Sequence, residues 1–186
     1  MSESKGRLIA VSDIHGYFPS LIKLINKIEP SKKDRIIFLG DYINIGPASR
    51  KVLDYLVEFK NNFPQTIFIK GNHEQMFLDY LSGKNKETFL GNGGYSVLRR
   101  YTVFGKIVIP EEHVVFIENL IPFHEEGDYV FVHAGFKPGL PIRKNDLNTM
   151  LWIRREFIES EYNWGKELFL VIPLSNSRFS EKIKLG

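Results

Sequence analysis

The strongest structural signal in this sequence is the run Ile36-Ile37-Phe38-Leu39-Gly40-Asp41-Tyr42-Ile43-Asn44-Ile45-Gly46. Its first four residues are apolar, as in a buried strand of a parallel sheet, and Gly40 ends that strand. A carboxylate, Asp41, follows in the loop that leaves the strand. Because open α/β sheets bind ligands outside the carboxyl ends of their strands, the run predicts an α/β fold with a ligand site at that edge.

The same pattern occurs three more times, with side chains of the kinds that bind metals soon after an apolar strand. We expect these strands at residues 8–11, 66–69 and 129–132. The side chains that follow them are Asp13 and His15, Asn72 and His73, and His133. Alternation along an extended chain places Asp13 and His15 on the same side, where both can reach one cation.

Apolar residues at helical spacing predict helices between these strands. The predicted helices cover residues 18–28, about 47–61, a segment ending near 81, about 95–101, 110–119 and 146–160. Residues 82–94 are rich in Gly, Asn and Lys, and we expect a surface loop near the site there. Because the sequence shows no internal repeat and no linker, we expect one domain over residues 1–186.

Composition limits the classes of function. The chain has 186 residues, a formal net charge of +3 and no cysteine, with a pI near 9.0. Its Lys and Arg are dispersed, which fits anionic substrates but offers no basic patch for nucleic acid. The lack of cysteine excludes disulfides and thiolate metal sites. The first residues are polar and no apolar run reaches membrane-spanning length, so we expect a cytoplasmic protein without a nucleic-acid or membrane partner.

The four strand ends together offer carboxylate oxygens, an amide oxygen and imidazole nitrogens. This donor set suits Mn²⁺, Fe²⁺ or Zn²⁺ better than Ca²⁺. Two such ions bridged by one carboxylate acidify water and clamp an in-line phosphoryl displacement, and a histidine can protonate the leaving oxygen. Each piece alone has a structural explanation, because Asp and Asn often form turns after strands. Their occurrence in order at four strand ends favours a site. We interpret His113 and His124, which lie away from strand ends, as surface residues.

Four motifs of the chain resemble those of the calcineurin-like metallophosphoesterases, above all the bacterial and phage serine/threonine protein phosphatase branch. They are Asp13-Ile14-His15-Gly16, Gly40-Asp41-Tyr42-Ile43, Gly71-Asn72-His73-Glu74 and Val132-His133-Ala134-Gly135. Trp152-Ile153-Arg154-Arg155 also resembles that branch. The likeness covers about residues 7–167, and residues 168–186 form an atypical tail.

The resemblance implies an αββα sandwich with a dinuclear metal site. Asp13, His15 and Asp41 would hold the first ion. Asp41 would bridge to the second ion, which Asn72, His133 and one further histidine would hold. The expected cofactors are therefore two divalent metal ions, with Mn²⁺ as the first choice and Fe or Zn as alternatives.

The resemblance also implies two catalytic roles and shows a departure from the family pattern. His73 would protonate the leaving group, and the planar guanidinium of Arg154 would bind phosphate. The family pattern at residues 40–46 is Gly-Asp-x-x-Asp-Arg-Gly, whereas this chain has Asn44 and Ile45. Asn44 would keep the place of the residue that orients the catalytic histidine but lacks its charge, and Ile45 cannot bind phosphate. We expect the two losses to cost on the order of 10²–10⁴ in rate.

A second departure lies in the tail. After Lys166 the family carries an apolar strand and Gly-His-Thr, whose histidine completes the second metal site, whereas this chain has no later histidine. We expect a fold truncated at its last strands, with residues 169–174 as a substitute strand, and a weakened second metal site. We also expect the protein to be less stable than an intact relative. The codons TTG GTC ATA CCN can encode Leu170-Val171-Ile172-Pro173, and from their third letter they encode Gly-His-Thr. An out-of-frame tail over residues 168–186 is therefore one hypothesis.

Several functions remain open from the sequence. The first is a metal-dependent phosphatase that acts on phosphoserine or phosphothreonine, and a neighbouring branch of the family hydrolyses dinucleoside tetraphosphates. The partner would be a phosphorylated protein or a small phosphoester, and the sequence does not give the oligomeric state. Asn44, Ile45 and the missing histidine favour instead an impaired relative that binds metal and phosphate without turnover, or a decaying gene product.

Overall fold

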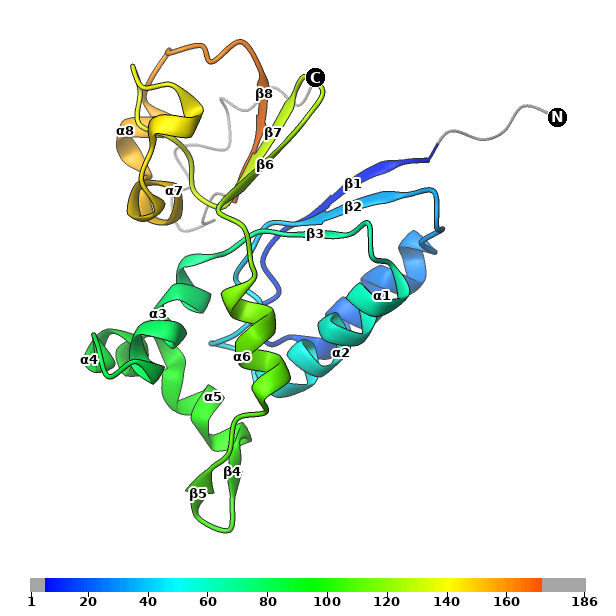
Figure 1. The fold of residues 1–186 in the computed structure, drawn as a ribbon, viewed down its shortest axis with the longest axis vertical. Coiled ribbons are helices and arrows are strands. Elements are labelled where there is room, and N and C mark those ends of the chain that lie inside the picture. The colour runs from blue at the N-terminus through cyan, green and yellow to red at the C-terminus, as the bar shows by residue number, and fades with distance from the viewer. Residues whose placement is uncertain (1–5, 172–186) are drawn as a thin grey trace, which may run out of the picture.

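The computed structural model of the chain describes residues 6–171, which form two β-sheets packed face to face with helices on their outer faces (Figure 1). The layers are therefore helix, sheet, sheet and helix, as expected for an αββα sandwich. A separate group of helices extends from one end of the first sheet (Figure 1). No helix in this part of the chain is both long and apolar enough to cross a lipid bilayer.

The first sheet contains three parallel strands in the order β1-β2-β3. They span Leu8–Val11 (β1), Arg35–Phe38 (β2) and Ile67–Phe68 (β3). β3 is shorter than the predicted strand over 66–69, and a bridge between Ile69 and Ile121 continues its line. Because the three strands run in the same direction, the polar residues after each of them meet at one edge.

Two amphipathic helices cover the outer face of the first sheet. They are α1 (Phe18–Ile28), which coincides with its predicted bounds, and α2 (Ser49–Asn62). Leu21 and Ile25 of α1 and Leu53 of α2 are buried in the same core cluster as Phe38 of β2. Pro19 lies in the first turn of α1, where its missing N–H costs no hydrogen bond.

The second sheet has three strands in the order β6-β7-β8. They span Phe123–Glu126 (β6), Tyr129–Val132 (β7) and Glu167–Phe169 (β8). β6 pairs antiparallel with β7 around a turn at Gly127 and Asp128, and β8 pairs parallel with β7. β6 is not among the strands predicted from the sequence, because its run Phe-His-Glu-Glu is mostly polar.

The faces between the sheets are apolar. Ile37, Leu39 and Ile69 from the first sheet pack in one cluster with Phe131 and Val171 from the second. On the outer face of the second sheet, Val130 and Val132 pack with Phe136 and Met150. The helices on that face are α7 (Leu147–Trp152) and α8 (Arg155–Ile158), preceded by the 3₁₀ turn η2 (Ile142–Lys144).

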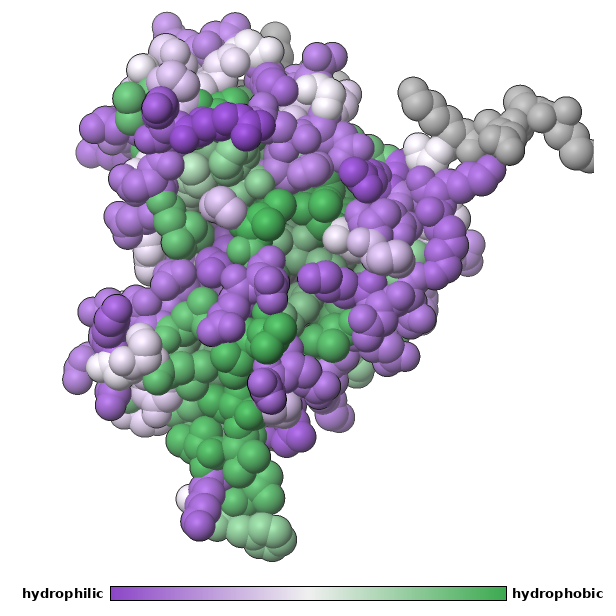
Figure 2. All heavy atoms as spheres, viewed as in Figure 1, coloured by the Kyte–Doolittle hydropathy of each residue, from purple (hydrophilic) through white to green (hydrophobic). Residues whose placement is uncertain are grey.

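The remaining elements lie between β3 and β6. In chain order they are α3 (Asn72–Leu81), α4 (Lys86–Phe89), the kinked turn η1 (Leu90–Gly94), α5 (Tyr95–Arg100), β4 (Thr102–Val103), β5 (Lys106–Ile107) and α6 (Glu111–Glu118). β4 and β5 form a projecting hairpin with a fully exposed Phe104. Apolar surface gathers over the hairpin at the lower end of Figure 2.

Three expectations from the sequence need correction. Residues 82–94 lie mostly at the surface, as expected, and Asn92 reaches the site through its hydrogen bond with Asn44. The segment is not a plain loop, however, because it contains α4 and a kinked turn, and Phe89 is fully buried against Phe77 and Tyr80. The single helix over 146–160 is broken at Ile153 and Arg154, whose backbones leave the helical region. His113 is fully buried, because it packs on the ring of Tyr101; His124 is partly exposed on β6.

The described part of the tail consists of β8 and the two residues after it. The expected substitute strand over 169–174 includes Phe169, the last residue of β8, whereas residues 172–174 lie outside the described residues. Val171 continues the pairing beyond β8, because its N–H donates to the carbonyl of His133 at 2.9 Å. The hypothesis of an out-of-frame tail also falls mostly on residues 172–186, which are outside the description.

Candidate metal centre

The carboxyl ends of the strands surround one cavity of about 690 Å³. The side chains that line it are Ser12, Asp13, His15, Asp41, Asn72, His73, His133, Arg154, Leu170 and Val171. The list contains every site residue predicted from the sequence except Asn44, which lies behind His73 and contacts its ring. The fold therefore brings together residues that are more than a hundred positions apart in the chain.

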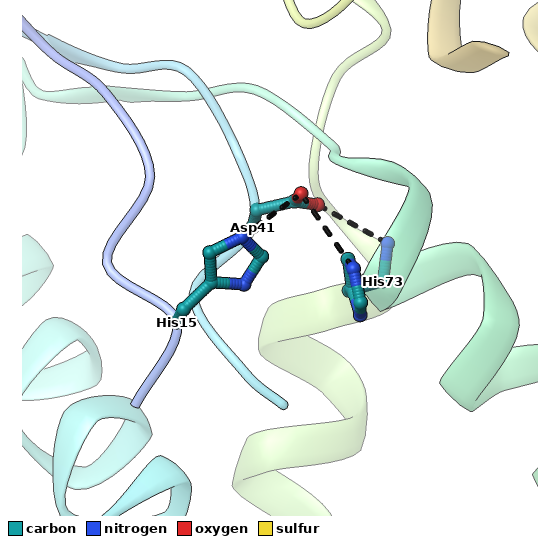
Figure 3. Close-up of side chains that lie close together, drawn as sticks. All are labelled: His15, Asp41 and His73. Atoms are coloured by element: carbon teal, nitrogen blue, oxygen red, sulfur yellow. Dashed lines mark hydrogen bonds and ion pairs between the residues drawn. The ribbon is translucent and has the colours of Figure 1, made fainter. Parts of the chain in front are cut away.

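Asp41 occupies the centre of this group. Its Oδ2 lies 3.6 Å from Nε2 of His15, 3.9 Å from Nε2 of His73 and 3.5 Å from Nε2 of His133. Figure 3 shows the rings of His15 and His73 on either side of the Asp41 carboxylate. The backbones of Asp41 (φ 53°) and His15 (φ 46°) are left-handed, a strained conformation that often marks functional sites.

Glu74 holds the loop that carries Asp41. Its buried carboxylate accepts backbone N–H bonds from Asp41 at 2.9 Å, Tyr42 at 2.8 Å, Ile43 at 3.2 Å and Gly71 at 3.1 Å. Burial and the nearby Asp41 carboxylate raise the pKa of Glu74, and the N–H groups of Tyr42, Ile43 and Asp41 oppose that shift because they stabilise the charged form. The motifs alone indicate no role for Glu74, although its place in the first turn of α3 is that of a capping-box carboxylate.

Gly40 and Gly71 allow the two loops to approach each other closely. A Cβ at Gly40 (φ 102°) would lie 2.6 Å from the Gly71 nitrogen, and one at Gly71 would lie 2.2 Å from Oδ1 of Asp41. Neither position can carry a side chain without moving the backbone. The glycines in the Gly-Asp and Gly-Asn-His motifs therefore set the distance between Asp41 and the start of α3.

Two histidines present a lone pair to the cavity. Nδ1 of His133 lies 2.8 Å from the carbonyl of Leu39, and Nδ1 of His15 lies 3.2 Å from the carbonyl of Ile43. Because a carbonyl oxygen only accepts, each Nδ1 carries the hydrogen and each neutral ring has an unprotonated Nε2. This is the tautomer of a histidine that binds a metal through Nε2, oriented by a backbone acceptor.

The contacts among these acceptors fit a bound cation. Nε2 of His133 lies 2.9 Å from Oδ1 of Asn72, and burial lowers the pKa of His133, so two acceptors face each other. Oδ1 of Asp13 is buried without a hydrogen-bond partner among residues 6–171. Burial and the nearby Asp41 raise the pKa of Asp13 to about 7. These residues need positive charge between them, and their oxygen and nitrogen donors suit Mn²⁺, Fe²⁺ or Zn²⁺.

His73 differs from the other two histidines. The Asn44 amide donates to Nδ1 of His73 at 2.7 Å and to the carbonyl of Asn92 at 3.0 Å. Nε2 of the neutral His73 ring therefore carries the hydrogen, and it faces the cavity. Burial lowers the pKa of His73 to about 4, and the neutral Asn44 supplies no charge to offset the effect. In this state the ring can donate a hydrogen bond into the cavity, but it is not the imidazolium that a general acid requires, and the neutral Asn44 does not stabilise that form.

Arg154 enters the cavity from the break between α7 and α8. Its Nη1 donates to the carbonyl of Ile153 at 2.8 Å and to that of Leu151 at 3.4 Å, which fixes the guanidinium at the cavity wall. Ile45 takes no part in the cavity lining and is more than half exposed, in a separate hollow that Tyr95 also lines. Leu170 and Val171 complete the wall beside His133 with aliphatic side chains.

The chain was compared with known proteins. The sequence profile of the family described as calcineurin-like phosphoesterase matches residues 6–181. A symmetrical bis(5'-nucleosyl)-tetraphosphatase from Methylococcus capsulatus is 26% identical over 136 residues, which are 70% of this chain and 44% of that protein. The catalytic subunit of serine/threonine-protein phosphatase 4 from Eremothecium gossypii is 35% identical over 88 residues, which are 47% of this chain and 28% of that protein.

A solved structure provisionally described as a diadenosine tetraphosphatase shares the fold. It superposes with a TM-score of 0.67 at 18% identity and covers 91% of this chain and 76% of its own. The chain spans less than half the length of the curated relatives named above.

Proposed function

The chain belongs to the calcineurin-like phosphoesterases, and from this we propose that it hydrolyses phosphoesters with two divalent metal ions at the centre around Asp41. The observation that carries the proposal is the set of mutually facing acceptors, above all the 2.9 Å contact between Nε2 of His133 and Oδ1 of Asn72. A cavity of about 690 Å³ in front of this set leaves room for a phosphoryl group.

The residues divide into ligands and catalytic groups. Asp13, His15 and Asp41 would hold one ion, and Asp41 with Asn72 and His133 would hold the other. When bound, such ions supply a water of lowered pKa and offset charge on the phosphoryl oxygens. We propose Mn²⁺ as the resident metal, with Fe or Zn as alternatives.

His73 and Arg154 act on the substrate directly in this proposal. Nε2 of His73 faces the cavity; once the ring has been protonated to an imidazolium, it would donate the Nε2 proton to the leaving oxygen, which departs as a neutral hydroxyl while His73 returns to its neutral form. The guanidinium of Arg154 would bind the non-bridging oxygens of the phosphoryl group through charge-assisted hydrogen bonds. Asn44 would orient His73 without lending it the negative charge that stabilises an imidazolium.

We propose a dinucleoside tetraphosphate as the first candidate substrate. The tetraphosphatase relative aligns with 136 residues of this chain, against 88 for the phosphatase 4 subunit. A groove of about 460 Å³ also adjoins the cavity and shares Asn72 with it. Its lining includes Trp152 and the amides of Gln75, Asn85 and Asn148. An indole ring can stack on a base and amides can bond its edge, which suits a nucleotide beyond the scissile phosphate.

The second candidate is phosphoserine or phosphothreonine in a protein. It was the first hypothesis from the motifs and is supported by the 35% identity to the phosphatase 4 subunit. A direct test compares turnover of diadenosine tetraphosphate and of a phosphothreonine peptide by the purified chain with Mn²⁺. We expect faster turnover of the tetraphosphate, lost in His73→Ala. Faster turnover of the peptide would reverse the order of the two substrates.

An impaired metal- and phosphate-binding relative is the competing functional class. Asn44, Ile45 and the aliphatic Val171 beside His133 favour it. If a folded protein shows metal-dependent phosphate binding and neither substrate is turned over above the His73→Ala background, this class replaces the hydrolase proposal.

A further inference from the structure

A second group of metal-binding side chains lies where α2 and α6 pack together. It consists of Asp54 from α2 and of Glu112 and His113 from the first turn of α6. One donor atom from each residue lies within 4.8 Å of the other two. The three residues differ from those that line the cavity around Asp41, and the proposed hydrolysis uses none of them.

His113 is the unusual member of this group, because a fully buried imidazole needs partners for both ring nitrogens. Nδ1 lies 2.8 Å from the hydroxyl of Tyr101, which is also fully buried. Nε2 has no hydrogen bond to any residue of the described chain, although it lies 3.0 Å from Oδ1 of Asp54. The nitrogen is thus close to the carboxylate but not directed at it.

This geometry is the one that two ligands of a common ion show. With bonds of about 2.0–2.2 Å from nitrogen and oxygen to a metal, neighbouring donors stand about 3–3.5 Å apart, and each points at the ion instead of at the other donor. The hydrogen bond between Nδ1 of His113 and the Tyr101 hydroxyl allows either direction. With Nδ1–H as the donor, the Nε2 lone pair is free for a metal, whereas with the hydroxyl as the donor Nε2 carries its hydrogen toward Asp54. Burial lowers the pKa of His113 and so favours the neutral ring that metals bind.

We propose that Asp54, Glu112 and His113 form a structural Zn²⁺ site, separate from the centre around Asp41. One imidazole nitrogen and two carboxylate oxygens are a donor set that Zn²⁺ accepts, with a fourth position open to water. Arg50, one helical turn before Asp54, packs its guanidinium 5.7 Å from the centre of the Tyr101 ring. Two carboxylates against this one cation leave the site with a net negative charge, which a divalent ion reverses.

The site would connect two parts of the fold. α2 covers the first sheet, whereas α6 and Tyr101 belong to the group of helices between β3 and β6. An ion bound to Asp54 on one side and to Glu112 and His113 on the other would cross-link them, so we expect Zn²⁺ to stabilise the protein beyond its effect at the catalytic cavity.

The number of Zn²⁺ ions bound to the full chain, and their affinity, can be measured by equilibrium dialysis with metal analysis. Asp54→Asn and Glu112→Gln remove one charge each on the surface and leave the buried His113 in place. Glu111→Gln is the matched control, because Glu111 precedes Glu112 on the same exposed helical turn but lies outside the group. In Asp54→Asn and Glu112→Gln we expect the affinity for one equivalent of Zn²⁺ to fall by about tenfold or more, which is the least that a lost ligand should cost. In Glu111→Gln we expect that affinity to stay unchanged.

Thermal unfolding with and without Zn²⁺ gives a second readout. We expect the Zn²⁺-dependent rise in Tm to shrink in Asp54→Asn and Glu112→Gln and to persist in Glu111→Gln. Equal binding stoichiometry and equal Tm shifts in all four proteins would overturn the proposal. Because the comparison is of metal binding away from the Asp41 centre, its result does not depend on whether the chain hydrolyses phosphoesters.

Discussion

The Asn44 amide donates to both His73 and the carbonyl of Asn92, so at the scale of single residues it fixes which ring nitrogen of His73 holds the hydrogen. Asn44→Asp would place a carboxylate beside Nδ1 and stabilise the imidazolium that a proton donor needs. We expect kcat for phosphoester hydrolysis to rise on the order of 10–10²-fold, within the usual contribution of general acid catalysis. Asn44→Ala is the control and should lower kcat. A kcat in Asn44→Asp at or below that of the parent would refute the assigned role of Asn44.

Glu74 supports the site without lining the cavity, because four backbone N–H groups of the two loops converge on its carboxylate. Glu74→Gln replaces one acceptor oxygen with an NH₂ group that faces these donors. We expect the variant to lose about 2–4 kcal/mol of unfolding free energy, as for other buried groups left unpaired. Urea unfolding measures the change, with the exposed Glu87→Gln as control. Identical midpoints for Glu74→Gln and Glu87→Gln would contradict the prediction.

Asp34 is expected to make the free energy of unfolding fall as the pH becomes acidic. Its buried carboxylate accepts from the Arg7 guanidinium at 2.8 Å and from the backbone N–H groups of Ser31 at 2.8 Å and Arg7 at 2.9 Å. The Arg7 hydrogen bond and these donors hold the pKa of Asp34 well below its usual value. The folded state therefore binds fewer protons than the unfolded one in acid. The stabilisation is complete above the unfolded pKa of about 4 and is lost as pH falls below it.

The test of this linkage is unfolding free energy as a function of pH. Between about pH 6 and pH 3 we expect a steeper loss of stability in the parent than in Asp34→Asn, which has no charge to titrate. The variant should also be less stable at neutral pH. Parallel pH profiles for the two proteins would show that Asp34 does not contribute to acid unfolding.

At the scale of elements, β8 positions Val171, an aliphatic residue at the wall of the proposed metal site. β8 runs parallel to β7, and Val171 just beyond it donates to the carbonyl of His133. Val171→His would place an imidazole at the cavity wall beside His133. We expect Mn²⁺ affinity to increase by about tenfold or more, by analogy with groups that tune metal affinity. Mn²⁺ titration measures it, with Val171→Phe as a control of similar bulk. No difference between the two variants would show that position 171 does not reach the metal site.

The break between α7 and α8 shows what local pattern cannot reveal. The apolar spacing over residues 146–160 predicts one helix, because nothing in it marks Ile153 and Arg154 as non-helical. The break turns the Arg154 guanidinium toward the cavity and bonds it to carbonyls of the preceding turn. The tertiary structure thus overrides helical periodicity at this point, which is consistent with the role proposed for Arg154.

At the scale of the whole molecule, the arrangement of the strand ends could be predicted from the sequence. Each motif follows directly on its apolar strand, and parallel strands carry their carboxyl ends to one edge. The αββα fold and the meeting of Asp13, Asp41, Asn72 and His133 follow from these local signals together with the family resemblance.

Features that depend on contacts between distant segments could not be predicted in this way. The four bonds to Glu74, the tautomers of His15 and His133, and the burial of His113 against Tyr101 each need three-dimensional coordinates. The polar strand β6 also escapes a search for apolar runs, because its pairing with β7 defines it. The short helix α4 within residues 82–94 depends on the burial of Phe89, which no spacing in that glycine-rich segment indicates.

The most direct test of a metal-dependent hydrolase centred on Asp41 is hydrolysis of p-nitrophenyl phosphate by the purified full chain. It is measured with and without Mn²⁺, beside His73→Ala and Asp41→Asn. We predict turnover that requires Mn²⁺ in the parent and is lost in both variants, since one lacks the proton donor and the other the bridging carboxylate. A folded parent protein that shows no Mn²⁺-dependent turnover above the His73→Ala background would contradict the account.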